Sequence, residues 1–179
     1  LQDLNRADSN IITCEDPVEY QLAGINQVQI HEDVGLTFSA ALRSILRQDP
    51  DIVLVGEIRD KITAEIAVKA ALTGHLVLST LHTNDAAGAI TRLIDMGIEP
   101  FMLGSALVCA QAQRLYRKLC QACRKKTTLT REILTTNHID PESFEGATVY
   151  SPGTCPRCSN GYKGRGAIME VLLVNEQIR

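Results

Sequence analysis

Short apolar runs recur along the first half of the chain, and polar residues follow each of them. Three of these runs are rich in Val, Ile and Leu, which is the pattern of strands buried on both faces of a parallel sheet. The three runs span residues 10–14, 52–55 and 75–81. Residues 25–30 alternate apolar and polar side chains and therefore predict a further strand.

Amphipathic segments lie between and after these runs. Thr37 and Thr63 are suited to begin two helices, because a threonine side chain can accept a backbone N–H at a helix start. Gly74 is suited to end the second of them. We expect four helices, over about 38–47, 63–73, 86–96 and 100–111. Strands that alternate with helices indicate an α/β domain with a mostly parallel sheet.

The chain changes character near Arg114. From there basic residues cluster, two Cys-x-x-Cys pairs begin, and only one short helix is expected, over residues 129–136. We therefore predict a division into residues 1–113, an α/β core, and residues 114–179, a small C-terminal subdomain.

The composition is that of a small globular protein. Of 179 residues, 45% are hydrophobic and 22% are charged, and the formal net charge is −3. Nothing in the overall charge indicates nucleic acid as a partner. No apolar run reaches the roughly 18 residues that a membrane-crossing helix needs. The start at Leu1 shows neither an initiator Met nor an export signal, so we expect a piece from the middle of a longer cytoplasmic protein.

Polar side chains follow three of the predicted strands. Glu15, Asp16 and Glu19 come after the first, residues 57–60 after the second and residues 82–85 after the third. Ligands of open parallel sheets bind beyond the carboxyl ends of the strands, so we expect the three clusters to meet at one edge. Each cluster by itself could equally be a set of helix caps or solvated turns.

The middle cluster carries the most specific chemistry. Residues 52–57 form an apolar strand that delivers a carboxylate, Glu57, through a glycine. A buried strand holds such a carboxylate rigidly, where it can act on Mg²⁺ directly or through water, or orient an attacking water. This is the logic of a Walker B element, in which the protein supplies positioning and electrostatics. The alternative is an ordinary core strand followed by an exposed glutamate.

Three segments together resemble the motifs of secretion ATPases, the hexameric motors of type II secretion and type IV pilus assembly. Residues 12–20 are similar to the Asp box of that family, residues 46–60 to its Walker B signature and residues 73–84 to its His box. Their order and spacing match as well, and the resemblance covers nearly the whole chain. It implies a RecA-like P-loop NTPase core, α/β with a mostly parallel sheet, and a small C-terminal subdomain that is helical and binds zinc through four cysteines.

The resemblance also implies roles for individual residues. Glu15 would position or activate the attacking water, with Glu19 close by, and Glu57 would serve Mg²⁺ and the γ-phosphate. His75 and His82 would sense the γ-phosphate or couple neighbouring active sites. Taken alone, without the resemblance, each histidine is better explained by a structural role.

Further family positions with a nucleotide-binding role are matched by one acid and four arginines. A guanidinium suits phosphate recognition because it is planar and always charged. Surface ion pairing is the alternative for each arginine. The matched residues are Asp16, Arg43, Arg47, Arg59 and Arg92.

One motif that a P-loop ATPase requires is missing. No G-x-x-x-x-G-K-[ST] string occurs, and no glycine in the chain is followed by lysine. In the family this Walker A loop lies shortly before the Asp box. We therefore expect that it was cut away together with the N-terminal domain, and that the isolated chain is inactive.

Four cysteines form two knuckles, at Cys120 and Cys123 and at Cys155 and Cys158. Four thiolates suit a structural Zn²⁺ ion, because they surround it tetrahedrally and leave no position open for water. A redox dithiol and an iron–sulfur cluster are the alternatives. By resemblance, this element marks the assembly branch of the family, since retraction ATPases lack it.

We therefore predict an ATP-hydrolysing motor that works as a homo-hexamer with ATP, Mg²⁺ and Zn²⁺. The expected partners are an inner-membrane platform protein and a cytoplasmic adaptor, through which the motor would lie at the bacterial inner membrane. The alternative is a non-catalytic, zinc-stabilised regulatory or docking module. A DNA-binding zinc protein rests only on the basic cluster near Cys120, and the acidic net charge disfavours it.

Overall fold

The computed structural model describes residues 1–144 and 147–179. They form two compact units, Leu1–Ala112 with Glu170–Arg179, and Gln113–Met169. The division differs from the predicted one at its end, because the last ten residues belong to the first unit, where the Val174 N–H donates to the Val108 carbonyl at 3.0 Å. As a statement about domains, the division at residue 113 stays a prediction.

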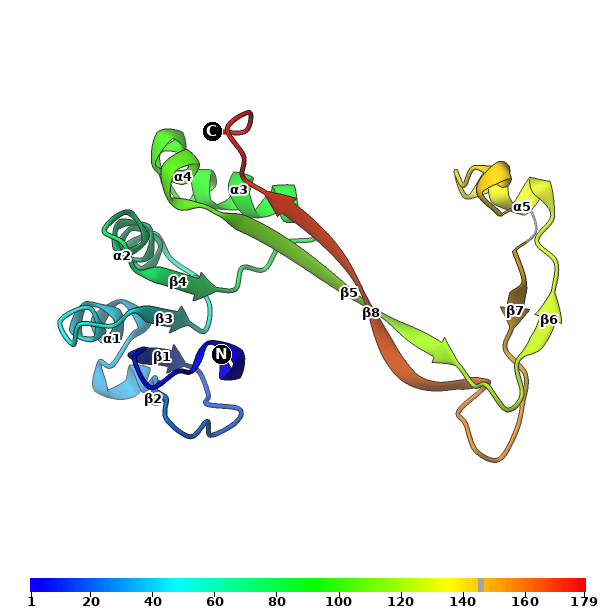
Figure 1. The fold of residues 1–179 in the computed structure, drawn as a ribbon, viewed down its shortest axis with the longest axis horizontal. Helices are drawn as coiled ribbons and strands as arrows, with labels where there is room; N and C mark the ends of the chain where they lie inside the picture. Colours follow the sequence, from blue (N-terminus) through cyan, green and yellow to red (C-terminus); the bar gives the residue numbers. More distant parts are fainter. Residues whose placement is uncertain (145–146) are drawn as a thin grey trace. The chain divides into compact units, whose positions relative to one another are not determined.

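Four parallel strands form the sheet of the first unit (Figure 1). The strands are β1 (Ile11–Glu15), β2 (Asn26–Gln29), β3 (Ile52–Val55) and β4 (Leu76–Ser79), and their order in the sheet is β2-β1-β3-β4. The predicted parallel α/β core is thus confirmed. One expectation was wrong: β4 is not buried, because it is an edge strand of this sheet and its residues are half-buried or exposed.

The helices of the first unit are α1 (Phe38–Ile45), α2 (Lys61–Leu72), α3 (Ala86–Asp95) and α4 (Pro100–Ala106), with the short 3-10 helices η1 (Gln2–Leu4) and η2 (Glu32–Val34). Helix α1 packs against β1 and β3, α2 against β4, and α4 against α2. Thr37 caps α1 as predicted, since its hydroxyl accepts the Ala40 N–H at 3.2 Å. Thr63 does not begin α2. Asp60 caps that helix, and its carboxylate accepts both the N–H and the hydroxyl of Thr63.

The hydrophobic core of the first unit forms where these helices meet β1 and β3. Helix α1 shows how the sequence produces it. Phe38, Ala41, Leu42 and Ile45 recur at helical spacing and are all buried. Each such large side chain contributes about 1.5–3 kcal/mol on full burial. The core therefore holds the strands rigidly from one side and leaves their carboxyl ends to carry polar residues.

The last helix of the first unit is shorter than expected. The predicted helix over 100–111 ends at Ala106, and Leu107 has extended backbone angles. Residues from Cys109 to Leu119 instead form strand β5, which pairs with β8 (Tyr162–Leu173). Pairing with a segment fifty residues away thus overrides the local helical pattern.

The second unit consists largely of strands. Parts of β5 and β8 belong to it, together with an antiparallel pair, β6 (Lys125–Thr127) and β7 (Val149–Ser151). The helix expected over 129–136 is present as α5 (Arg131–Thr136), with Thr130 as its cap, and η3 (Pro141–Phe144) follows. The helical content is thus one short α-helix and one 3-10 helix among the described residues.

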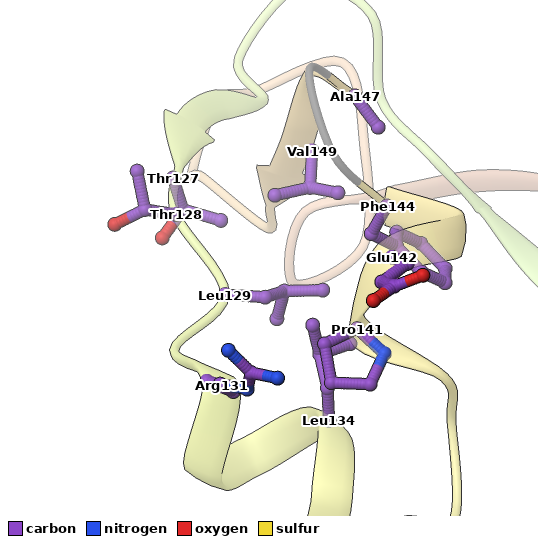
Figure 2. Close-up of a pocket in the computed structure, with 10 residues that line it drawn as sticks. All are labelled: Thr127, Thr128, Leu129, Arg131, Leu134, Pro141, Glu142, Phe144, Ala147 and Val149. Atoms are coloured by element: carbon purple, nitrogen blue, oxygen red, sulfur yellow. The ribbon is translucent and has the colours of Figure 1, made fainter.

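A hollow of about 430 Å³ lies inside this second unit (Figure 2). Leu129, Val149 and Pro141 point toward it, and Arg131 and Glu142 lie at its sides. Leu134, which also lines it, is only 5% exposed. Leu129 and Phe144, which also line the hollow, are exposed, and none of the predicted site residues lines it.

None of the helices within residues 1–144 and 147–179 combines the length and apolar character that crossing a membrane requires.

Candidate functional site

The segments that follow β1, β3 and β4 lie along one edge of the sheet, because the strands are parallel and adjacent. Backbone and side-chain hydrogen bonds tie these segments together. The Gly56 N–H donates to the Cys14 carbonyl at 2.8 Å and the Ile58 N–H to the Thr80 carbonyl at 3.0 Å. The Thr80 hydroxyl donates back to the Gly56 carbonyl at 2.7 Å. The polar residues that the sequence places after each strand are therefore neighbours.

Gly56 allows the close approach of two of these segments. A Cβ at this position would lie 3.2 Å from the Cys14 carbonyl oxygen and 3.3 Å from the Glu15 Cα. Only glycine fits there without displacing backbone. The glycine thus sets Glu57 beside the end of β1, where Glu15 stands.

Glu57 is the centre of an ionic cluster. The Arg59 guanidinium donates to its Oε1 at 2.6 Å, and the His82 Nε2 lies 3.0 Å from its Oε2. Since an ionised carboxylate can only accept, Nε2 is the donor in the His82 contact. The Glu57 side chain is 15% exposed, whereas those of Arg59 and His82 are 55% and 89% exposed.

The hydrogen bond from Arg59, and then the one from His82, hold the pKa of the Glu57 carboxyl below its usual range. In turn Glu57, and to a smaller degree Asp16, raise the pKa of the Arg59 guanidinium. The Glu57 carboxyl and the Arg59 guanidinium are therefore ionised at neutral pH. A half-buried carboxylate of this kind can hold a hydrated cation or orient a water molecule.

Glu15 ends β1 and has a different environment. Its Oε1 accepts the Thr13 hydroxyl at 2.5 Å and the Gln27 side-chain amide at 3.0 Å. Thr13 precedes Glu15 by two residues on the same face of β1, and Gln27 is the β2 residue paired with Thr13. Neither Thr13 nor Gln27 was predicted from the sequence as a partner of Glu15. The period of two along the strand points to Thr13, whereas Gln27 follows only once the strand register is known.

The remaining predicted residues fall into two groups. Asp16 and Glu19 are exposed in the loop after β1, near the same edge of the sheet. His75 precedes β4, so it lies at the amino ends of the strands, and its Nδ1 lies 3.0 Å from the Ala70 carbonyl oxygen. Arg43 and Arg47 line a surface hollow together with His75.

His75, Arg43 and Arg47 thus lie near the amino ends of the strands. The cluster around Glu57 lies at the carboxyl ends of the strands. Arg92 lies in the last turn of α3 and is exposed. Membership of a motif could not reveal this separation, because a single motif runs from the amino end of a strand to its carboxyl end. The roles of all these residues stay predictions.

A second candidate site is the cysteine cluster of the second unit. The four Sγ atoms of Cys120, Cys123, Cys155 and Cys158 all lie within 4.8 Å of one another. The Sγ–Sγ distances are 3.8 Å for Cys120–Cys155, 3.6 Å for Cys123–Cys158 and 3.5 Å for Cys155–Cys158. A tetrahedral Zn²⁺ with Zn–S bonds of about 2.3 Å requires Sγ–Sγ distances of about 3.8 Å. The donor set therefore fits zinc.

Tight backbone turns build this cluster. The Cys123 N–H and the Arg124 N–H both point to the Cys120 carbonyl, and the Cys120 N–H donates to the Gly161 carbonyl at 2.8 Å. Gly161 has a φ of +86°, which favours glycine. The Arg124 guanidinium stacks on the Tyr150 ring at 4.0 Å from its centroid. Four thiolates around one ion would leave no position for water or substrate, so the arrangement suits a structural metal ion.

Comparison with known proteins agrees with this geometry. The family described as Type II/IV secretion system protein matches residues 1–179. The chain is 56% identical to the type IV pilus assembly ATPase PilB of Myxococcus xanthus and 53% identical to the type II secretion system protein E of Dickeya dadantii, over 96% and 100% of its length.

Among solved structures, the pilus retraction motor PilT with bound ADP superposes with a TM-score of 0.67 at 31% identity, covering 99% of this chain and 42% of that one. The ATPase DotB of Legionella pneumophila has a TM-score of 0.62 at 21% identity and shares the fold. The chain spans about a third of the two curated relatives, 31% of PilB and 35% of protein E. With the family match over its whole length, the chain belongs to the type II/IV secretion system protein family.

Proposed function

We propose that these residues are the catalytic and zinc-binding part of an ATP-hydrolysing motor that powers type II secretion or type IV pilus assembly. The observation that carries the proposal is the pair of carboxylates, Glu15 and Glu57, held at the carboxyl ends of adjacent parallel strands with Arg59 and His82 bonded to Glu57. In phosphoryl transfer the protein acts mainly by positioning and charge, and this edge supplies both.

Each residue has a distinct task in this proposal. Glu57, kept ionised by Arg59, would help to hold Mg²⁺, directly or through water, and the ion would supply positive charge for the phosphates of ATP. Glu15 takes the proton of the attacking water or orients it, with Glu19 nearby in the following loop. His82 donates to Glu57 and can exchange that bond for one to the γ-phosphate, which would report the state of the nucleotide.

The other predicted residues would act from different places. Asp16 lies near Arg59, and its charge helps to keep that guanidinium protonated. We propose that Arg43, Arg47 and His75, at the opposite edge of the sheet, and Arg92, on α3, serve nucleotide of the assembled motor from outside the Glu57 cluster. A guanidinium suits that purpose because it binds phosphate through two parallel N–H groups.

The phosphate cradle has to come from elsewhere in the protein. Residues 1–179 contain no G-x-x-x-x-G-K-[ST] string, and they span about a third of the curated relatives. We therefore propose that a Walker A loop outside these residues completes the site and that these residues alone do not hydrolyse ATP.

The proposed machine is an assembly motor. The relatives PilB and protein E, each more than half identical to this chain, are named for pilus assembly and type II secretion. We propose that the full-length protein forms a homo-hexamer in the cytoplasm and meets the inner membrane through a platform protein and an adaptor. Zn²⁺ held by the four cysteines would stabilise the second unit without taking part in hydrolysis.

Steady-state ATP hydrolysis by the full-length protein tests the proposal. Glu57→Gln and Glu15→Gln should each lower kcat by about 10²–10⁴-fold, the usual contribution of a positioned acid or base. Glu132→Gln is the matched control, because Glu132 is exposed on α5 of the second unit and none of the proposed roles involves it. Wild-type turnover in the Glu57→Gln protein would refute the assignment and favour a non-catalytic zinc-stabilised module instead.

A further inference from the structure

We propose that Thr13 and Gln27 are positioning residues for Glu15, and that Gln27 links this carboxylate to the exposed turn at Tyr20–Leu22. The inference rests on the proposed function, in which Glu15 handles the attacking water. It adds two residues that no motif identifies, together with a link from Glu15 to a turn at the protein surface.

The bond from Thr13 is short and shielded from water. The Thr13 side chain is fully buried, and its hydroxyl lies 2.5 Å from the Glu15 Oε1. Hydroxyl-to-carboxylate bonds of this length are of the strong, charge-assisted kind. Because the residue lies on an inner strand of the sheet and its side chain is fully buried, the hydroxyl has little room to turn away from the carboxylate. Thr13 therefore holds one oxygen of the Glu15 carboxylate in place.

Gln27 fixes the same oxygen from the neighbouring strand. Its Nε2 donates to the Glu15 Oε1 at 3.0 Å and to the Tyr20 carbonyl at 3.1 Å, while its Oε1 accepts the Leu22 N–H at 2.8 Å. The orientation of the amide is thereby determined, since a flipped amide would set its oxygen against two acceptors and its nitrogen against a donor.

Both bonds converge on Oε1. Within the described residues no hydrogen bond to the Glu15 Oε2 is formed. The protein thus holds Oε1 of Glu15 in place. Because the carboxylate is rigid, Oε2 is also fixed in position, and it is the oxygen that can bind water. A general base has to be placed in this way, because an error of about 1 Å in a reacting group can lower the rate about 100-fold.

The turn to which Gln27 is bonded lies at the surface. Tyr20 is 79% exposed, and Gly24, with a φ of +79°, lets the chain turn back toward β2. Of these three hydrogen bonds of the Gln27 side chain, two join it to this turn and one joins it to Glu15. A displacement of the turn would therefore draw the amide away from Glu15.

The first experiment measures ATP hydrolysis by the full-length protein carrying Gln27→Met, which keeps the length of the side chain and removes its hydrogen bonds. We expect kcat to fall about tenfold or more, while KM for ATP changes less than about twofold, because the residue places the base and does not bind nucleotide. Gln177→Met is the control, since Gln177 is exposed near the end of the chain. Wild-type kcat in Gln27→Met would overturn the proposal.

Two further measurements separate positioning from a general loss of structure. Thr13→Ser should keep kcat within about threefold of wild type, whereas Thr13→Val, of the same shape, should lower it about tenfold. In a Glu15→Gln background, Gln27→Met should have no further effect, because both changes act through one group. An additive effect would show that Gln27 acts elsewhere.

The link to the turn has its own test by hydrogen exchange. The Leu22 N–H should lose protection in Gln27→Met and keep it in Thr13→Val, since only Gln27 accepts that N–H. Unchanged protection of Leu22 would refute the link. If the wild-type protein hydrolyses no ATP, or if Glu15→Gln is as active as wild type, the proposed function fails and not this inference alone.

Discussion

Gly153→Ala should abolish zinc binding without touching a cysteine. A Cβ at residue 153 would lie 1.8 Å from the Cys123 carbonyl oxygen and 2.8 Å from its carbonyl carbon, whereas real Cβ atoms essentially never approach within 3.0 Å. The backbone of one knuckle must therefore shift by at least the 1.2 Å between 1.8 and 3.0 Å. Metal sites tolerate errors of about 0.2 Å in ligand distance, so a shift of this size removes Cys123 from the tetrahedron.

The expected loss of zinc affinity exceeds about 100-fold, since changes of residues that only support a ligand already lower affinity 10–100-fold. The assay is zinc content after dialysis, followed by titration against a chromogenic chelator. Gly164→Ala is the control: its φ of +79° makes any side chain strained, at about 1–3 kcal/mol, but no atom lies within 4 Å of the added Cβ. One tightly bound zinc in Gly153→Ala, at wild-type affinity, would refute the geometric argument.

Two further predictions concern the first unit. Burial raises the pKa of the Cys14 thiol from 9.0 to about 11, so the buried neutral thiol supports folding below pH 9, and this contribution is lost as the pH rises through 11. At about 1.4 kcal/mol per pH unit the loss is about 3 kcal/mol, and urea unfolding at pH 9 to 11 should show a shallower decline for Cys14→Ala than for wild type. An identical decline in both proteins would contradict this. Asp60→Ala should lower the unfolding free energy by about 1–2 kcal/mol at neutral pH, because it removes the cap of α2, and Asp60→Asn should lower it less. Burial raises the pKa of Asp60, but the two hydrogen bonds from Thr63 and one from the Ile62 N–H together outweigh it and lower that pKa. The difference between wild type and Asp60→Ala should therefore shrink as the pH falls below 3.8. A difference that persists in acid would mean that the cap does not depend on the charge.

Gly166 shows how tertiary structure can require a residue that no local pattern explains. A Cβ there would lie 2.5 Å from the Tyr116 ring, which therefore occupies the space that a larger side chain would need. The two positions are linked by the pairing of β5 with β8, which the sequence analysis did not predict.

Much of the first unit was open to sequence reasoning, because its signals are local. The runs that became β1 and β3 are mostly apolar, as burial on both faces favours, and the periodic face of α1 is the face that is buried. The cap at Thr37 and the left-handed Gly74 depend only on the residues beside them. The spacing of the four cysteines pointed to a zinc site in the same way, and the observed distances between their sulfur atoms fit that ion.

Tertiary structure decided which polar residues share a site. Glu57 and His82 are 25 residues apart in the sequence and 3.0 Å apart in space, because β3 and β4 are adjacent and end together. His75 belongs to the same motif as His82 but lies at the other edge, since a strand separates the two. Gln27 reaches Glu15 only through the register of β1 against β2. Local patterns report burial and backbone shape, whereas the pairing of distant strands is a property of the whole fold, and the candidate site lies where those pairings end.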